Sequence, residues 1–163
     1  MADAPTVHAS AVLVGPRAVL IRGQAGVGKS RLALALIRAA ASGQVGFARL
    51  VGDDRVHLEV HHGRLLVRPA AVLAGLVEVR GLGIRRLPYE PVAVVGWVVD
   101  LATFDVQRMP AQSDLSVVIA GVRLPRLAVA SGEDPLPFVL AMLALPDADD
   151  HIGRAPGGPA AEK

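Results

Sequence analysis

The sequence predicts a strand-rich α/β domain, and three observations carry this prediction. Hydrophobic residues make up 52% of the 163 residues, which is enough to bury a core. Aromatic residues make up only 3%, so the core must be built from Val, Leu, Ile and Ala. Many short apolar runs of strand length are separated by turn residues, whereas few segments have helical spacing. This order differs from the regular strand–helix alternation of a doubly wound sheet.

The elements follow in order along the chain. Apolar runs bounded by turn residues predict strands. They occupy residues 7–14, 17–22, 47–54, 91–101, 115–121 and 122–130. Alternation around His62-Gly63 predicts a hairpin over residues 55–69, and residues 77–88 are expected as a strand that runs into a glycine-punctuated loop. Helical spacing predicts a helix over residues 29–41 that ends near Gly43, a helical turn within 69–76 and a second helix over 135–145.

Length and composition predict one domain over residues 1–145 and a disordered tail over residues 146–163, which is rich in Gly, Pro, Ala and acidic residues. The absence of cysteine excludes disulfides and thiolate metal sites. A net charge of +2 and scarce aromatics argue against nucleic-acid binding. No apolar run reaches the roughly 18 residues needed to cross a bilayer and no signal peptide is evident, so we expect a cytoplasmic protein without a membrane partner.

One short segment has the spacing of a phosphate-binding loop, G-x-x-x-x-G-K-[ST]. It consists of Gly23, Gln24, Ala25, Gly26, Val27, Gly28, Lys29 and Ser30. Glycines let backbone N–H groups approach phosphate oxygens, and the following helix adds the positive end of its dipole. Lys29 is expected on the β- and γ-phosphates, and Ser30 offers a hydroxyl to Mg²⁺. The alternative is an ordinary strand–turn–helix, but one of only two lysines in the chain stands at this position.

Two adjacent carboxylates follow the predicted strand that ends at Gly52. Asp53 and Asp54 stand where a metal-binding acid on a strand next to the P-loop strand is expected. One carboxylate can hold Mg²⁺, and the other can take a proton from an attacking hydroxyl. The alternative is a solvated turn.

Two further residues have open roles on local evidence. Glu78, within VEVRGLGI, is either a metal ligand or an exposed strand residue paired with Arg80. His8, on the first strand, is on local grounds more often a core or surface histidine than a site residue.

Three segments, GQAGVGKS, RLVGDDRV and VEVRGLGI, together resemble the bacterial HPr kinase/phosphorylase family in order and spacing. The resemblance covers residues 6–143 and is to the catalytic C-terminal domain, in particular to the short alphaproteobacterial form. It implies a strand-rich P-loop kinase core similar to phosphoenolpyruvate carboxykinase. It also implies ATP and Mg²⁺ as cofactors.

The resemblance assigns roles to individual residues. It implies that Asp54 is the general base for serine phosphorylation, tuned by His8, and that Asp53 is its acidic neighbour. Lys29 matches the phosphate-binding lysine. Ser30 and Glu78 match the Mg²⁺ ligands, with help from Asp53. Arg108, in DVQRMP, matches a catalytic arginine by a looser alignment.

The resulting prediction is a protein serine kinase that phosphorylates an HPr-like carrier of the phosphotransferase system. Departures from the family pattern qualify it: Arg31 replaces an acid, the long glycine-rich loop after GLGIRRLP is absent, and Glu133 replaces an arginine in an anion-binding loop. The last change predicts weak or absent phosphorylase activity. The alternative is a nucleotide-binding sensor or regulator with little turnover, acting with a sensor kinase or other phosphotransferase regulators. A small-molecule kinase and a homo-oligomer both stay open.

Overall fold

The computed structural model describes residues 4–104 and 106–145. The predicted tail at 146–163 lies outside these residues. The strands are β1 (Val7–Val14), β2 (Arg17–Arg22), β3 (Ala48–Gly52), β4 (Arg55–His61), β5 (Arg64–Pro69), β6 (Leu76–Val79), β7 (Gly83–Arg86), β8 (Ala93–Thr103), β9 (Ser116–Ile119) and β10 (Val122–Ala130). The helices are α1 (Lys29–Ala41) and α2 (Pro135–Ala144), with short 3₁₀ turns η1 (Ala71–Leu73) and η2 (Gln112–Leu115).

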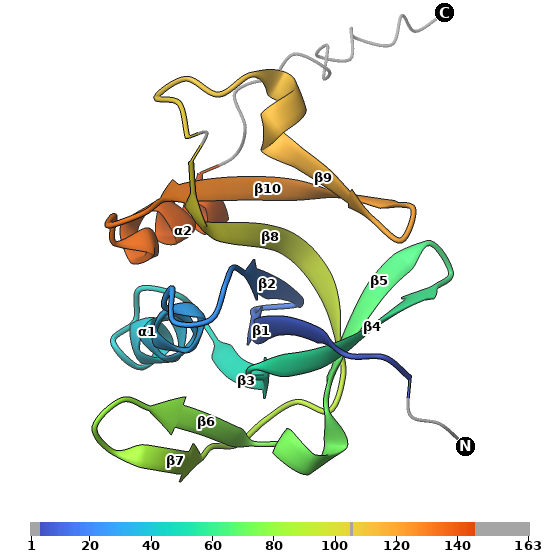
Figure 1. Ribbon diagram of the computed structural model, residues 1–163, viewed down its shortest axis with the longest axis vertical. Helices are drawn as coiled ribbons and strands as arrows, with labels where there is room; N and C mark the ends of the chain where they lie inside the picture. The colour runs from blue at the N-terminus through green and yellow to red at the C-terminus, as the bar shows by residue number, and fades with distance from the viewer. Residues whose placement is uncertain (1–3, 105, 146–163) are drawn as a thin grey trace, which may run out of the picture.

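The main sheet closes on itself. β1 pairs antiparallel with β2 and β4, β4 pairs with β5, β5 pairs with β8, and β8 returns to β2 in parallel. β3 adds to β1, and β10 followed by β9 adds to β8 (Figure 1). The strand-rich α/β class predicted from the sequence is therefore confirmed, and its strands are arranged as a ring with extensions.

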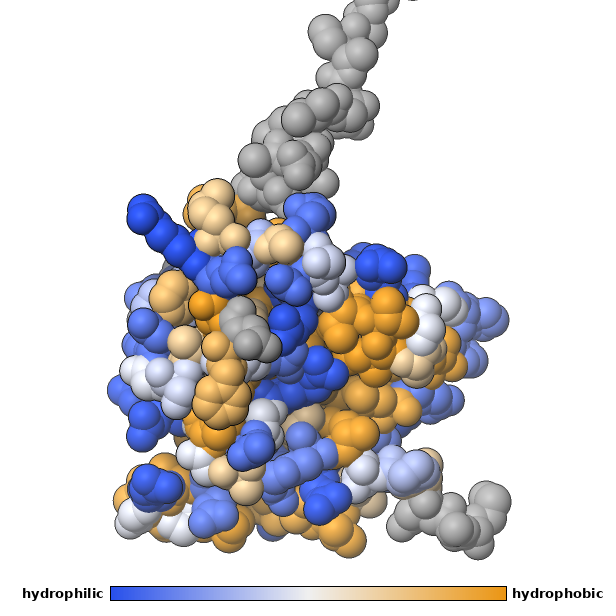
Figure 2. All heavy atoms as spheres, turned by 45° about the horizontal axis from the view of Figure 1, so that its top comes forward, coloured by the Kyte–Doolittle hydropathy of each residue, from blue (hydrophilic) through white to orange (hydrophobic). Residues whose placement is uncertain are grey.

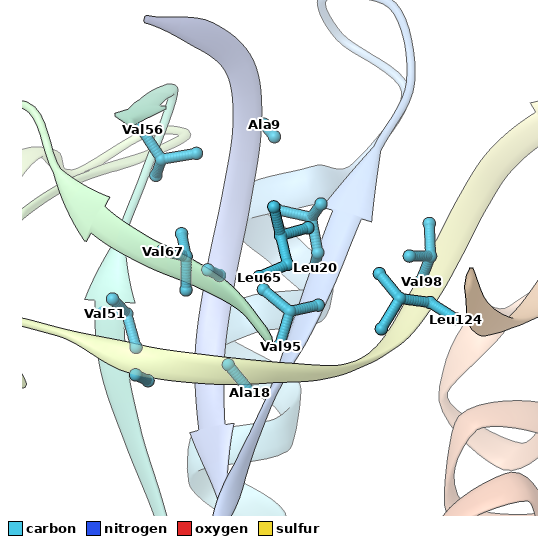
Figure 3. Packing of buried hydrophobic residues seen from close by; sticks show 12 residues of the cluster. Ala9, Ala18, Leu20, Val51, Val56, Leu65, Val67, Val95, Val98 and Leu124 are labelled. Carbon is cyan, nitrogen blue, oxygen red and sulfur yellow. The ribbon is translucent and has the colours of Figure 1, made fainter. Parts of the chain in front are cut away.

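Two apolar layers lie on the two faces of this sheet, because successive side chains of a strand point to opposite sides. Leu20 points into the ring and packs with residues such as Val67 and Val95 (Figure 3). Val19 and Ile21 point the other way, toward α1 and α2. Burying each such side chain stabilises the fold by about 1.5–3 kcal/mol.

The ends of the two helices follow from their flanking residues. Gly43, with φ of 80°, follows α1, and the N–H groups of Gly43 and Gln44 donate to the carbonyls of Ala40 and Ala39. This is the Schellman pattern that glycine at this position favours. At α2, the side chain of Asp134 accepts a hydrogen bond from the Leu136 N–H at 3.2 Å. Both helices thus begin or end on residues suited to that position.

Three local expectations are confirmed only in part. The segment expected as a strand and a loop at 77–88 is a two-stranded ribbon, β6–β7, separate from the main sheet and beside α1 (Figure 1). The helical turn expected within 69–76 is only the three residues of η1. The long strand expected at 91–101 runs two residues later, as β8. The hairpin at 55–69 is confirmed, with positive φ at both His62 and Gly63.

The surface keeps apolar side chains near the tips of two hairpins. Val60 on β4 is 43% exposed and Val118 on β9 is 53% exposed. Figure 2 shows one face of the molecule, on which apolar areas lie on either side of a polar centre. Within the described residues, no helix has both the length and the apolar character that a membrane crossing requires.

Candidate active site

The glycine-rich loop connects the end of β2 to the start of α1. Gly23 has φ of 154°, and a Cβ there would lie 2.7 Å from the Val27 side chain and 3.3 Å from the Leu101 carbonyl oxygen. Only glycine fits this position without displacing its neighbours. Gly28 caps α1 with φ of 106° and no side-chain hydrogen bond closes the helix start. The first N–H groups of a 13-residue helix are therefore not taken up by a capping side chain, as an anion site requires.

Lys29 points back into this loop. It is 6% exposed, and its Nζ donates to the carbonyl oxygens of Gly23 at 2.8 Å and Gln24 at 2.9 Å. Burial lowers the pKa of Lys29, while the charges of Asp54 and Asp53 oppose that change. The ammonium group therefore lies within the electrostatic reach of both carboxylates predicted as site residues.

The two carboxylates occupy a break between β3 and β4. Both strands pair with β1, β3 at Ala11–Val14 and β4 at Val7 and His8. Asp54, in the gap, has φ of 66°, and the Arg55 N–H donates to the Asp53 carbonyl at 2.7 Å. A hydrogen bond that spans one residue with positive φ marks a γ-turn of the rare, strained kind. Because of this turn, the Asp53 side chain is buried, whereas the Asp54 side chain is exposed.

Asp53 is buried and held by hydroxyl groups. It is 4% exposed. Ser30 Oγ donates to its two carboxylate oxygens at 2.9 and 2.8 Å, and Ser10 Oγ on β1 donates to Oδ1 at 2.6 Å. A carboxylate beside the hydroxyl of the P-loop serine is a set of hard oxygen donors, which is the kind that Mg²⁺ prefers. The structure therefore brings together two of the three predicted metal ligands, Ser30 and Asp53.

Asp54 lies toward solvent beside His8. Its side chain is 62% exposed, and its Oδ1 is 2.8 Å from His8 Nε2. The Asp54 carbonyl also accepts the Ala9 N–H at 3.2 Å, so the turn is fixed to β1. An accessible carboxylate with a histidine partner can exchange a proton with a substrate hydroxyl.

Among the described residues, no hydrogen bond or ion pair joins Glu78 or Arg108 to this cluster. Glu78 is exposed on β6, and Arg108 is exposed in the segment before η2. Among the described residues, no group of three or more His, Cys, Asp and Glu side chains is placed to hold a metal ion. The roles of Glu78 as third ligand and of Arg108 in catalysis stay predictions.

The position of the acid strand also differs from the expectation. β3, which leads to Asp53, lies one strand away from β2, because β1 separates them. The direct parallel neighbour of β2 is β8, where Asp100 pairs in register with Arg22. Asp100 is 8% exposed and bound to Arg22 and Arg126. The feature of the sequence that could have indicated this buried acid is its position within the longest apolar run, residues 91–102.

Comparisons with known proteins place this chain in a family. A family model described as the HPr Serine kinase C-terminal domain matches residues 1–87. The HPr kinase/phosphorylase of Clostridium beijerinckii is 38% identical over 84 residues, covering 52% of this chain and 26% of that protein. The Streptococcus gordonii protein of the same name is 33% identical over 141 residues, covering 79% of this chain and 43% of its own. The chain spans less than half the length of these curated relatives.

A solved structure gives the same fold. The Hpr(Ser) kinase/phosphatase from Coxiella burnetii superposes with a TM-score of 0.69 over 91% of each chain, at 21% sequence identity. Because it covers 91% of the chain, this similarity in fold extends beyond residue 87, where the match to the family model ends. Since the family model matches more than half of the 163 residues, the chain belongs to the HPr serine kinase C-terminal domain family.

Proposed function

We propose that this protein is an ATP- and Mg²⁺-dependent protein serine kinase that acts on an HPr-like phosphocarrier. The observation that carries the proposal is the different surroundings of the two carboxylates in the turn formed by Gly52, Asp53 and Asp54, here called the GDD turn. Asp53 is buried against Ser30 of the P-loop, while the adjacent Asp54 is exposed and paired with His8. A site that only binds nucleotide has no use for the second, accessible carboxylate.

The residues of this site fit a phosphoryl transfer in which separate groups bind the phosphates, bind Mg²⁺ and accept the proton. The loop amides and Lys29 would hold the phosphates of ATP, and Ser30 and Asp53 would hold Mg²⁺. Mg²⁺ bound there would neutralise charge on the phosphate oxygens.

Asp54 would take the hydroxyl proton of the substrate serine while the serine Oγ forms a bond to the γ-phosphorus of ATP. The bond to the oxygen bridging to the β-phosphate breaks at the same time, ADP leaves with that electron pair, and the proton passes from Asp54 through His8 to solvent.

The direct test combines radiolabelled ATP, Mg²⁺ and the organism's own HPr-type proteins, followed by mapping of the labelled residue. Asp54→Asn should abolish phosphoserine formation and leave ATP binding nearly intact. Glu59→Gln is the matched control, because Glu59 is an exposed carboxylate on β4 paired only loosely with Arg68 at 3.6 Å. If the unaltered protein binds ATP but labels no HPr-type protein, the regulatory alternative replaces the kinase.

We further propose that dephosphorylation is weak or absent. Glu133 lies exposed in the turn after β10, and the next residue, Asp134, already caps the start of α2. Two carboxylates at this helix start disfavour the approach of phosphate or phosphoserine. Incubation of phosphoserine-HPr with the protein, Mg²⁺ and phosphate or pyrophosphate should release little HPr. Efficient release would contradict this part of the proposal.

A further inference from the structure

The one hydroxyl group in the apolar centre of β1 is completely buried. Ser10 is 0% exposed, and its strand neighbours Ala9 and Ala11 point into the ring core. Strand alternation therefore turns the Ser10 side chain to the other face, where α1 begins. A buried hydroxyl costs free energy unless it forms a hydrogen bond. The only side-chain partner that the described residues give Ser10 is Asp53 Oδ1, at 2.6 Å.

This hydrogen bond is short enough to be a charge-assisted one. Ser30, from the start of α1, contacts both oxygens of Asp53, whereas Ser10, from β1, contacts Oδ1 alone. The carboxylate is thus fixed from two elements that are far apart in the sequence. Without Ser10, only Ser30 would determine its orientation among the side chains described, and Ser30 is itself a proposed metal ligand.

We propose that Ser10 is a positioning residue that orients Asp53 for Mg²⁺, and this inference rests on the proposed function. Ser10 touches neither nucleotide nor metal in this assignment. Its hydroxyl holds Oδ1 so that the Asp53–Ser30 pair is preorganised before the metal arrives. Loss of the hydroxyl should weaken metal binding and leave the phosphate contacts of Lys29 and the loop amides unchanged.

The test is calorimetric titration of ATP in Mg²⁺ and in EDTA, for the unaltered chain and three variants. Ser10→Ala removes the hydroxyl, Ser10→Cys keeps a side chain of similar size with only a weak donor, and Ser10→Thr keeps the hydroxyl. We expect Ser10→Ala and Ser10→Cys to lower the ratio of the ATP affinity in Mg²⁺ to the ATP affinity in EDTA about tenfold, because loss of a supporting hydrogen bond has an effect of this size at metal sites. Affinity in EDTA should not change, and Thr should retain the ratio.

Each other outcome overturns the inference. Equal losses in Mg²⁺ and EDTA in the Ala and Cys variants would show a merely structural role. If this ratio is unchanged in both variants, Ser30 alone orients Asp53. If the unaltered chain binds ATP equally well in Mg²⁺ and in EDTA, Asp53 holds no metal. A Thr variant that folds but behaves like Ala would contradict the role of the hydroxyl. The assay does not require HPr, so failure to label HPr would refute the proposed kinase and leave this result standing.

Discussion

The ion-pair cluster at the end of β2 and β8 allows a stability prediction of definite size. Asp100 accepts from Arg22 Nε at 2.7 Å, Arg22 Nη2 at 2.8 Å and Arg126 Nε at 2.6 Å. Asp100→Asn keeps the shape of the side chain but removes its charge and turns an NH₂ group toward a guanidinium. Breaking a buried ion pair costs about 3–5 kcal/mol. Because the Arg22 and Arg126 side chains are 35% and 22% exposed, water compensates in part, and we expect about 2–4 kcal/mol.

Urea unfolding at pH 7 measures this loss. Glu59→Gln removes the same charge from an exposed pair, with side-chain exposures of 57% and 48% for Glu59 and Arg68, and should cost no more than about 1 kcal/mol. Equal effects of the two variants on the free energy of unfolding would refute the argument, because they would show that burial adds nothing to the Asp100 cluster.

The same cluster predicts a pH dependence with a defined sign. Burial by itself raises the pKa of Asp100, but the hydrogen bonds from Arg22 and Arg126 lower it below its ordinary value overall. A carboxyl whose pKa is lower in the folded state stabilises the fold above its unfolded pKa of about 3.9, and this contribution is lost as the pH falls through the folded pKa. The difference between the unaltered chain and Asp100→Asn should therefore shrink below about pH 4. A difference that is constant down to pH 2 would contradict the assignment.

Two further predictions concern the GDD turn. A Cβ at Gly52 would lie 2.7 Å from Val56 Cγ1 and 3.1 Å from Pro69 Cα. Gly52→Ala should therefore destabilise the fold by about 1–3 kcal/mol, measured as a lower urea midpoint. An unchanged midpoint would show that β4 and β5 shift to accommodate the Cβ at no cost in stability. Removal of the Asp54 partner in His8→Ala should lower kcat for HPr phosphorylation by about 10²-fold with little change in ATP affinity, and a parallel loss of ATP affinity would instead place His8 in nucleotide binding.

The local elements were predictable because their signals are local. The P-loop has a fixed spacing, α1 has an apolar face and a glycine stop, and the hairpin at 55–69 has a turn dipeptide with positive φ at both residues. The ring closure has no such signal, because β2 and β8 pair across more than 70 residues of sequence. Hydrophobic alternation predicts that a strand is buried but not which strand lies beside it.

The ribbon β6–β7 shows a second limit. Gly81 and Gly83 both have positive φ, so glycines that suggested a loop instead shape the turn and edge of a hairpin. The four residues of β7 are all exposed, and an exposed strand has no apolar alternation to reveal it.

The GDD turn shows why a site needs both kinds of information. The sequence predicts two adjacent acids after a strand, and in a regular strand their side chains would point to opposite faces. The structure interrupts the strand at Asp54, with β3 before it and β4 after it on the same neighbour, β1. β1 carries His8 and Ser10, two residues apart and on the same face, so one strand partners each acid separately. The chemical difference between Asp53 and Asp54 therefore comes from β1 together with Ser30 of α1, and substitutions at His8 and Ser10 should separate proton transfer from metal binding.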